Sequence, residues 1–196
     1  SLTSMMSKLA RRGPDSNGKW LQGKIGFGHQ RLSIIDLSRN GNQPMVDDLL
    51  KLTLVFNGTI YNYKSLRSKL IGKGYSFFSH SDTEVIIKAY HCWGEDCVKY
   101  LDGMFAFCVW DQPNQKLFIA RDRMGIKPLY YNLSNKAFTF ASNSQALLTQ
   151  ELDRSVNPLA LQQQLSLHGV VPAPNTIING IQKVKPATVI TINTKG

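Results

Sequence analysis

The sequence predicts an α+β fold with antiparallel sheets, because hairpin patterns are mixed with helical patterns and the chain shows no strict strand-helix-strand order. Apolar runs joined by turn residues occur at residues 105–121 and again at residues 129–141, and each indicates a hairpin. Segments with apolar residues at helical spacing lie before and between these hairpins. The 196 residues, 42% hydrophobic and 18% charged, suffice for one globular domain with a sizeable core.

The N-terminal third of the chain contains a helical pattern followed by strand patterns. Residues 2–10 carry apolar side chains at positions i, i+3, i+4 and i+7, which predicts an amphipathic helix. Residues 24–35 alternate and then run apolar, which predicts one or two strands. A further strand is predicted at residues 52–56, and it runs into Asn57-Gly58, a dipeptide that favours a tight turn.

Two helices are predicted next. The first has Leu66 and Leu70 on one face and ends at a pair of glycines. The second begins near Ser81, because Ser81 and Glu84 have the spacing of a capping box and apolar residues follow at helical spacing. The remaining predicted elements, in chain order, are the hairpin 105–111 with 116–121, the hairpin 129–131 with 137–141 across Ser134-Asn135, helices at 144–150 and 158–168, and an edge strand at 188–192.

Composition excludes several classes of protein. No apolar run approaches the 18 residues that span a bilayer, and the N-terminus lacks the apolar block of a secretory signal, so we expect a cytoplasmic protein without membrane contact. Cys92, Cys97 and Cys108 form no CxxC pair and are expected to be buried or idle thiols. The net charge of +10 is scattered along the chain rather than gathered on one element, so we expect no nucleic-acid partner.

Eight sequence blocks in a fixed order carry a resemblance over nearly the whole chain. The blocks are RGPD (12–15), GHQRLSIIDL (28–37), QPM (43–45), FNGTIYNY (56–63), SDTEV (81–85), LDGMFAF (101–107), RDRMGIKPLYY (121–131) and FAS (140–142). Together they resemble the glutaminase domain of glutamine-hydrolysing asparagine synthetases. The resemblance implies a class II glutamine amidotransferase of the N-terminal nucleophile type.

This resemblance implies a fold and a domain order. The fold is a four-layer αββα sandwich of two antiparallel sheets, here lacking its first strand. Residues 1–170 would be a glutaminase-like domain truncated at its N-terminus. Residues 171–196 would be an exit segment with a strand, leading toward a synthetase domain that the chain lacks.

The family's chemistry uses an N-terminal cysteine, whose thiolate attacks the glutamine amide while its α-amine serves as the base. The products are glutamate and ammonia, and the ammonia serves the ATP-dependent amidation of aspartate in the synthetase domain. We expect no cofactor or metal in the present domain, with ATP and Mg only in the missing one. The family's Cys-Gly-Ile strand does not precede the helix at residues 2–10, so the chain as given is expected to lack the nucleophile.

The resemblance also assigns residues that bind the ends of glutamine. Arg31 matches the arginine that holds the α-carboxylate, a task suited to a two-pronged guanidinium, although a structural ion pair is the alternative. Asp82 matches the carboxylate that receives the substrate ammonium, while its place beside Ser81 also fits a helix cap. Leu32 and Ile34 match a wall of the glutamine pocket, and a strand core would explain them equally well.

Asn57 and Gly58 match the family's oxyanion hole, in which a side-chain amide and a backbone N–H converge on one oxygen. Thr59 stands where the family has a glutamate near the ammonium, and this departure is expected to weaken glutamine binding. It leaves open the alternative of a degenerate, non-catalytic module with a binding or scaffolding role. His29 is interpreted as structural, since no metal partner or nucleophile stands near it in the sequence. The expected partners are glutamine and the synthetase domain, with a homodimer possible.

Overall fold

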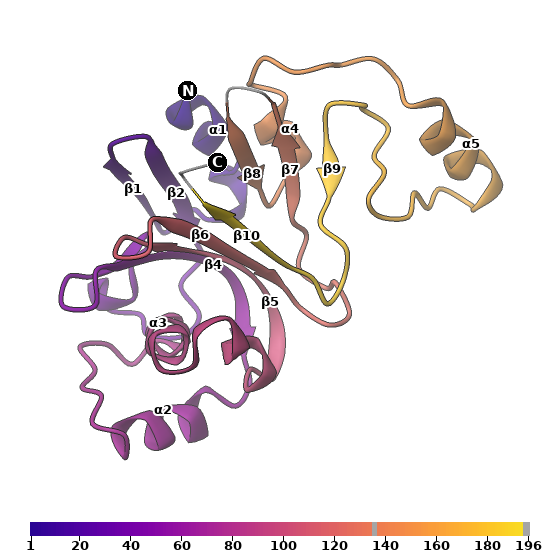
Figure 1. Cartoon of the computed structure of the whole chain (residues 1–196). Coiled ribbons are helices and arrows are strands. Elements are labelled where there is room, and N and C mark those ends of the chain that lie inside the picture. The colour runs from indigo at the N-terminus through magenta and orange to yellow at the C-terminus, as the bar shows by residue number, and fades with distance from the viewer. Residues whose placement is uncertain (135–136, 194–196) are drawn as a thin grey trace.

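The computed structural model describes residues 1–134 and 137–193, and it confirms an α+β fold with antiparallel sheets (Figure 1). The α-helices are α1 (Leu2–Ser7), α2 (Tyr63–Ile71), α3 (Asp82–Trp93), α4 (Ser144–Leu147) and α5 (Pro158–Ser166). The strands are β1 (Ser16–Gln22), β2 (Ile25–Arg31), β3 (Met45–Asp47), β4 (Leu52–Ile60), β5 (Gly103–Asp111), β6 (Lys116–Arg121), β7 (Tyr130–Leu133), β8 (Phe138–Ala141), β9 (Gln182–Lys183) and β10 (Val189–Asn193). Short 3₁₀ helices are η1 (Ala10–Arg12), η2 (Arg39–Gly41) and η3 (Gly94–Lys99).

A five-stranded sheet in the order β10-β6-β5-β4-β3 forms the centre of the molecule. Its longest pairing joins β4 to β5, from Leu52 opposite Asp111 to Ile60 opposite Gly103. Helices α2 and α3 pack on one face of this sheet (Figure 1). The core between them holds buried side chains of both layers, including Leu54, Phe56, Leu70, Ile86, Phe107 and Phe118. Burying each such side chain contributes about 1.5–3 kcal/mol.

The other face of the five-stranded sheet is covered by a layer in two parts, the pair β1-β2 and the sheet β8-β7-β9. The rings of Phe27 on β2 and Phe140 on β8 meet edge to face at a centroid distance of 6.0 Å. Helices α1 and α4 pack on the outside of this layer. At Gly28 a Cβ would lie 2.6 Å from the Sδ of Met6, so glycine allows α1 to approach β2 closely. The structure therefore has three sheets where the sequence predicted two.

Several boundaries differ from the sequence prediction. Strand β2 ends at Arg31, so the predicted strand does not extend over residues 32–35. Asn57 and Gly58 lie inside β4, opposite Ala106 and Phe105, so the tight-turn interpretation is wrong. Strands β1, β3 and β9 were not predicted. In β1 only half-buried and exposed positions occur, so it lacks the apolar alternation on which the prediction depends.

The predicted start of α3 is confirmed, but its capping differs from a capping box. The Oγ of Ser81 accepts a hydrogen bond from the N–H of Thr83 at 3.0 Å. The Glu84 carboxylate instead accepts from the backbone N–H groups of Phe78 and Ser79. The glutamate therefore fixes the loop that enters the helix rather than the cap residue itself.

The C-terminal part of the chain returns to the two sheets. Strand β10 pairs with β6 at the edge of the five-stranded sheet, as predicted, and β9 pairs with β7. The predicted exit segment from residue 171 thus contains paired strands, and its boundary stays a prediction. Asn135, half of the turn predicted for the second hairpin, lies outside the described residues, as do residues 194–196. In the part of the chain that the structure describes, no helix is long and apolar enough to cross a membrane.

Candidate functional site

Two cavities meet beside the end of β2 and the second half of β4. The first, called here the polar cavity, has a volume of about 240 Å³. The second, called the slot, has a volume of about 220 Å³. The residues that line both are Arg12, His29, Gln30, Phe56 and Asn57.

All seven of the site residues predicted from the sequence line the polar cavity. They are Arg31, Leu32, Ile34, Asn57, Gly58, Thr59 and Asp82. They come from β2 and the loop after it, from β4, and from the first turn of α3. Leu32 and Ile34 are 56% and 71% exposed and lie outside any strand, so the strand-core interpretation of these two residues is wrong.

Strand β4 continues beyond its partner β3, and side chains bind the edge that is left. β3 pairs with β4 only as far as Leu54. Beyond it, the N–H of Phe56 donates to Oε1 of Gln43 at 2.6 Å, and the N–H of Ile60 donates to Oδ2 of Asp82 at 3.0 Å. Backbone groups of alternate residues in a strand point to the same edge. The N–H of Gly58 therefore points to this edge too, and the described residues supply no recorded acceptor for it.

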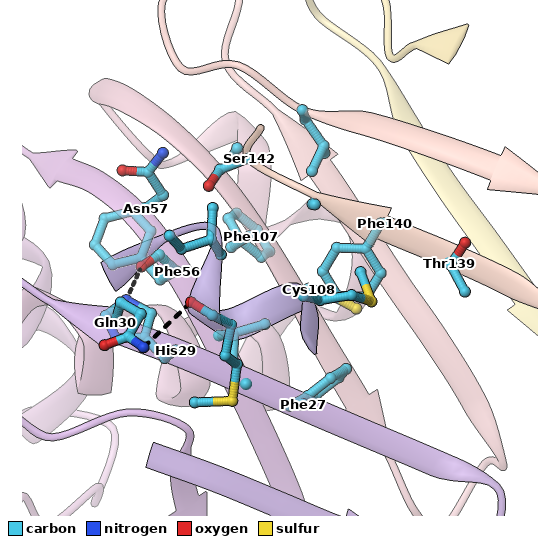
Figure 2. A pocket seen from close by; sticks show the side chains of 18 of the residues that line it. Phe27, His29, Gln30, Phe56, Asn57, Phe107, Cys108, Thr139, Phe140 and Ser142 are labelled. Atoms are coloured by element: carbon cyan, nitrogen blue, oxygen red, sulfur yellow. Dashed lines mark hydrogen bonds between the residues drawn. The ribbon is translucent and has the colours of Figure 1, made fainter. Parts of the chain in front are cut away.

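Asn57 lines both cavities, and Figure 2 shows its side chain among those around the slot. No hydrogen bond of its amide to a described residue is recorded, so its Nδ2 remains available as a donor. Gly58 is required beside it, because a Cβ there would lie 2.1 Å from the carbonyl oxygen of Met104. Two free donors, one from a side chain and one from the backbone, thus stand next to each other at the cavity wall. Such a pair can stabilise an oxyanion.

Arg31 is 6% exposed and fastens the loop after β2. Its Nη1 donates to the carbonyl oxygen of Ser38 at 2.9 Å and to Oδ1 of Asn42 at 2.7 Å, while Nη2 donates to the carbonyl oxygen of Asp36. Within the described residues it forms no ion pair. Three of the five guanidinium N–H groups are thereby used, and one on Nε and one on Nη2 remain for a carboxylate.

Asp82 is 4% exposed, and burial raises the pKa of its carboxyl group, with the hydrogen bond from Ile60 acting in the opposite direction. An ammonium group in the cavity would favour the charged carboxylate. Thr59 adds only a neutral hydroxyl to the wall. Arg12 and Lys127, which are not among the site residues predicted from the sequence, bring two further positive charges to the lining. Arg12 comes from η1 and Lys127 from the turn after β6. No sequence pattern indicates that these two distant residues lie near each other.

His29 contacts β4 from the opposite layer. Its Nε2 lies 3.2 Å from the carbonyl oxygen of Phe56, as the dashed line in Figure 2 marks. Burial, together with the nearby charge of Arg31, lowers the pKa of His29 to about 4. The imidazole is therefore neutral at neutral pH, and its buried Nδ1 has no hydrogen-bond partner in the described residues.

The slot lies between β2 and β8, which are each the last strand of their sheet on the side facing the other. Its floor includes Val55 and Cys108 of the five-stranded sheet, and its roof includes Met5 and Met6 of α1. Figure 2 labels Phe27 of β2 and Phe140 of β8 among the residues that line it. Within residues 1–134 and 137–193 these two strand edges have no neighbouring strand. Two such edges on either side of a narrow apolar cavity can accept an additional strand.

The three cysteines are placed away from the polar cavity. Cys97 and Cys108 are fully buried, as expected, and Cys92 is partly buried. Burial raises the pKa of the Cys97 thiol to about 12 and that of Cys108 well above its usual value. The thiolate is the reactive form, so neither buried cysteine is a nucleophile at neutral pH.

Comparison with known proteins identifies the family of the chain. The family model described as "Glutamine amidotransferase domain" matches residues 1–196. The glutamine-hydrolyzing asparagine synthetase 1 of Bacillus subtilis is 41% identical over all of this chain and 30% of its own length. Asparagine synthetase 3 of the same organism is 37% identical over all of this chain and 32% of its own. The chain thus spans about a third of these relatives. Amidase chry2 of Gibberella zeae is 35% identical, over 94% of this chain and 27% of its own length.

Solved structures show the same fold. The glutamine phosphoribosylpyrophosphate amidotransferase of B. subtilis, in complex with ADP and GMP, superimposes with a TM-score of 0.61 at 21% identity. The match covers 90% of this chain and 34% of that protein. At this identity the likeness concerns the fold alone, whereas the family model covers the entire sequence. The chain therefore belongs to the class II glutamine amidotransferase domain family.

Proposed function

We propose that the polar cavity binds glutamine and that the domain hydrolyses it to glutamate and ammonia. The observation that carries this proposal is the meeting of Arg31, Asp82 and the Asn57-Gly58 pair around one cavity of about 240 Å³. These groups offer two guanidinium donors, one buried carboxylate and two free amide donors. That set matches the α-carboxylate, the α-ammonium and the reacting carbonyl of one glutamine molecule.

The nucleophile in this proposal is a cysteine at the start of a strand that precedes Ser1 and occupies the slot. Such a strand would pair with β2 and β8 and join the two smaller sheets into one, giving the four-layer αββα sandwich. Asn57 lines both the slot and the polar cavity, so one end of the strand would reach the oxyanion donors. The buried cysteines of the chain supply no alternative.

The chemistry follows from these positions. The α-amine of the cysteine accepts the thiol proton, and the thiolate forms a C–S bond to the amide carbon. The oxyanion accepts hydrogen bonds from Nδ2 of Asn57 and the N–H of Gly58. The C–N bond then breaks, the amine returns the proton to the leaving ammonia, and water hydrolyses the thioester to glutamate and the free thiol.

We further propose that the ammonia serves an ATP-dependent amidation of aspartate in a synthetase domain of the same protein. The names of the relatives, and the two thirds of their length beyond the matched part, support this proposal. ATP and Mg would bind in that domain, with no cofactor in this one. The protein would act in the cytoplasm, with glutamine and the synthetase domain as its partners. A homodimer is also an expectation from the family resemblance.

Thr59 favours a second candidate function. Among the described residues, the lining of the polar cavity carries three positive side chains and one carboxylate, that of Asp82. A domain that binds glutamine weakly and does not cleave it would be a degenerate module with a regulatory or scaffolding role. This candidate differs from the first in one measurable respect, the release of ammonia.

The test begins with the intact mass and N-terminal residue of the native protein that carries this chain, followed by a glutaminase assay. An N-terminal cysteine and ammonia release are expected. In that protein Asn57→Ala should lower kcat about 100- to 1000-fold with little change in KM, as loss of one oxyanion donor does. Asn17→Ala, at an exposed position of β1, is the matched control.

Glutamine binding without ammonia release, in a protein that begins with cysteine, would establish the degenerate module instead. A native protein without a cysteine ahead of Ser1 would overturn the proposed nucleophile. If Asn57→Ala retained the wild-type kcat, the oxyanion assignment would be wrong.

A further inference from the structure

His29 connects the three parts of the site. It stands on β2, which forms one edge of the slot, and it lines both the slot and the polar cavity. Its ring crosses to β4 and contacts the carbonyl oxygen of Phe56, the residue immediately before Asn57 and Gly58. The position of this imidazole is therefore tied directly to the backbone that carries the oxyanion donors.

The two ring nitrogens have different roles, and the structure fixes them. A carbonyl oxygen only accepts hydrogen bonds, so Nε2 carries the proton and donates it to Phe56. In the neutral ring Nδ1 is then an acceptor. This atom is buried and has no donor among residues 1–134 and 137–193. An unpaired buried acceptor is costly, and the Oγ1 of Thr139, on the β8 side of the slot, is unpaired in the same way.

We infer that His29 is a positioning residue of the glutaminase reaction, which joins the strand in the slot to the oxyanion strand. Its Nε2–H donates to the Phe56 carbonyl, and its Nδ1 accepts an N–H of the slot strand. This inference rests on the proposed function, since it assigns His29 a part in the same reaction. It goes beyond the structural role expected from the sequence, because it relates His29 to the rate of hydrolysis.

Two consequences distinguish this role from a general packing role. Glutamine binding depends on Arg31 and Asp82, which His29 does not hold in place by a recorded hydrogen bond, so changes at His29 should affect kcat rather than KM. The Nδ1 contact forms only when the slot is filled. The imidazole therefore reports whether the strand is present, independently of any activity.

The kinetic test uses a pair of variants in the native protein that carries this chain. In His29→Gln the amide nitrogen can occupy the place of Nε2 and keep the Phe56 contact. In His29→Asn the shorter amide can occupy the place of Nδ1 and keep the slot contact. Each is expected to lower kcat about tenfold with KM unchanged, and His29→Leu, which removes both contacts, about 100-fold. His91→Gln, on the outer surface of α3, is the control.

The second measurement is the ¹⁵N spectrum of the histidine rings, recorded on this chain alone and on the native protein. We expect Nε2 to carry the proton in both, and the Nδ1 resonance of His29 to move upfield in the native protein as it gains a hydrogen bond. An Nδ1 resonance identical in the two samples would overturn the inference, whatever the activity.

The outcomes separate the inference from the proposed function. Wild-type kcat in His29→Gln and His29→Asn overturns the role of His29 but leaves glutamine hydrolysis intact. A rise in KM with unchanged kcat also overturns it, because His29 would then be a binding residue. Absence of ammonia release from the wild-type protein refutes the proposed function, and the ¹⁵N shift then still decides whether His29 contacts the slot strand.

Discussion

The two faces of the five-stranded sheet differ in whether their buried polar groups have hydrogen-bond partners. On the face covered by α2 and α3 they are paired: Nζ of Lys88 lies 2.5 Å from Oδ2 of Asp47, and the hydroxyl of Tyr90 donates to Asp111 at 2.9 Å. On the other face, two residues that line the slot each have a buried side-chain atom recorded without a partner in the described residues, Nδ1 of His29 and Oγ1 of Thr139. The helix-covered face is complete as it stands, and the other has room for a ligand and a strand.

Strand β4 belongs to both regions and shows why they differ. Its first residues pair on both sides, with β3 and with β5. From Phe56 onward the outer edge is bound by side chains instead, and Gly58 is left with a free N–H. Unpaired groups in an otherwise paired structure are the places where a protein meets its substrate. The comparison therefore predicts that changes in the helix-covered core alter stability, whereas changes on the second face and along the open edge of β4 alter binding and catalysis.

The largest expected effect is on the helix-covered face. Lys88→Met removes the cation that pairs with the carboxylate of Asp47. The side chains of Lys88 and Asp47 are only 7% and 4% exposed, so water cannot take the place of the lost partner. We expect the free energy of unfolding to fall by about 3–5 kcal/mol, as for other broken buried pairs. Urea denaturation measures this loss, and glutamine affinity at pH 7 should be unchanged under conditions where the variant is folded.

The matched control is Lys99→Met, which removes the exposed partner of Asp96 in α3's neighbouring helix η3. An exposed pair contributes about 0–1 kcal/mol, so this variant should unfold almost as the wild type does. Equal losses for the two lysine variants would contradict the distinction between the faces, and so would a weaker glutamine affinity in folded Lys88→Met.

A smaller effect is expected for a change in the polar cavity, where a substitution at Thr59 should strengthen glutamine binding. Thr59→Glu adds a second carboxylate to a lining with three positive side chains and should receive the substrate ammonium. A charge-assisted hydrogen bond contributes about 1.5–3 kcal/mol, which corresponds to roughly 10- to 100-fold tighter glutamine binding. Isothermal titration of this chain with glutamine measures the change.

Thr59→Gln is the control for Thr59→Glu, because it has nearly the same size and no charge. It should bind glutamine no more tightly than the wild type. If both variants gained affinity equally, the charge balance of the cavity would not be the cause, and Thr59 would no longer argue for a degenerate module.

Much of the fold could be predicted from local patterns. The hairpin of β5 and β6, the start of α3 at Ser81 and the edge strand β10 each have a periodicity or a capping residue that identifies them. Strand β1 could not be predicted, because its half-exposed residues show no apolar alternation. The second layer in two parts could not be predicted either, since strand order depends on contacts between distant segments.

The site shows the same division between local and distant information. The seven residues assigned through the family resemblance do line one cavity, although Asn57-Gly58 read locally indicates a turn. Asn57 and Gly58 lie in a strand rather than a turn because nine consecutive residue pairs between β4 and β5 outweigh the turn preference of one dipeptide. Arg12, Lys127 and the tie between His29 and Phe56 depend on tertiary contacts and have no signal in the sequence.

The last prediction concerns pH and separates the two faces by titration. The pKa of His29 is about 4 in the folded chain, against 6.5 for an ordinary histidine. Between these values the unfolded chain binds a proton that the folded chain does not, so stability falls as the pH is lowered through this window. From pH 7 to pH 5 the contribution is about 2 kcal/mol.

The charged groups that share the cavity with His29 are Arg12, Arg31, Lys127 and Asp82. Three of these side chains are cationic, so they do not stabilise a protonated His29. His29→Gln removes the titrating group but keeps a donor toward Phe56, and its unfolding free energy should therefore depend less on pH, by that same 2 kcal/mol. Parallel pH dependences of wild type and variant, measured by urea denaturation from pH 7 to pH 5, would show that His29 is not buried neutral. Lys88→Met, on the helix-covered face, should retain the wild-type His29 contribution, because Lys88 lies on the far side of the sheet and does not line either cavity.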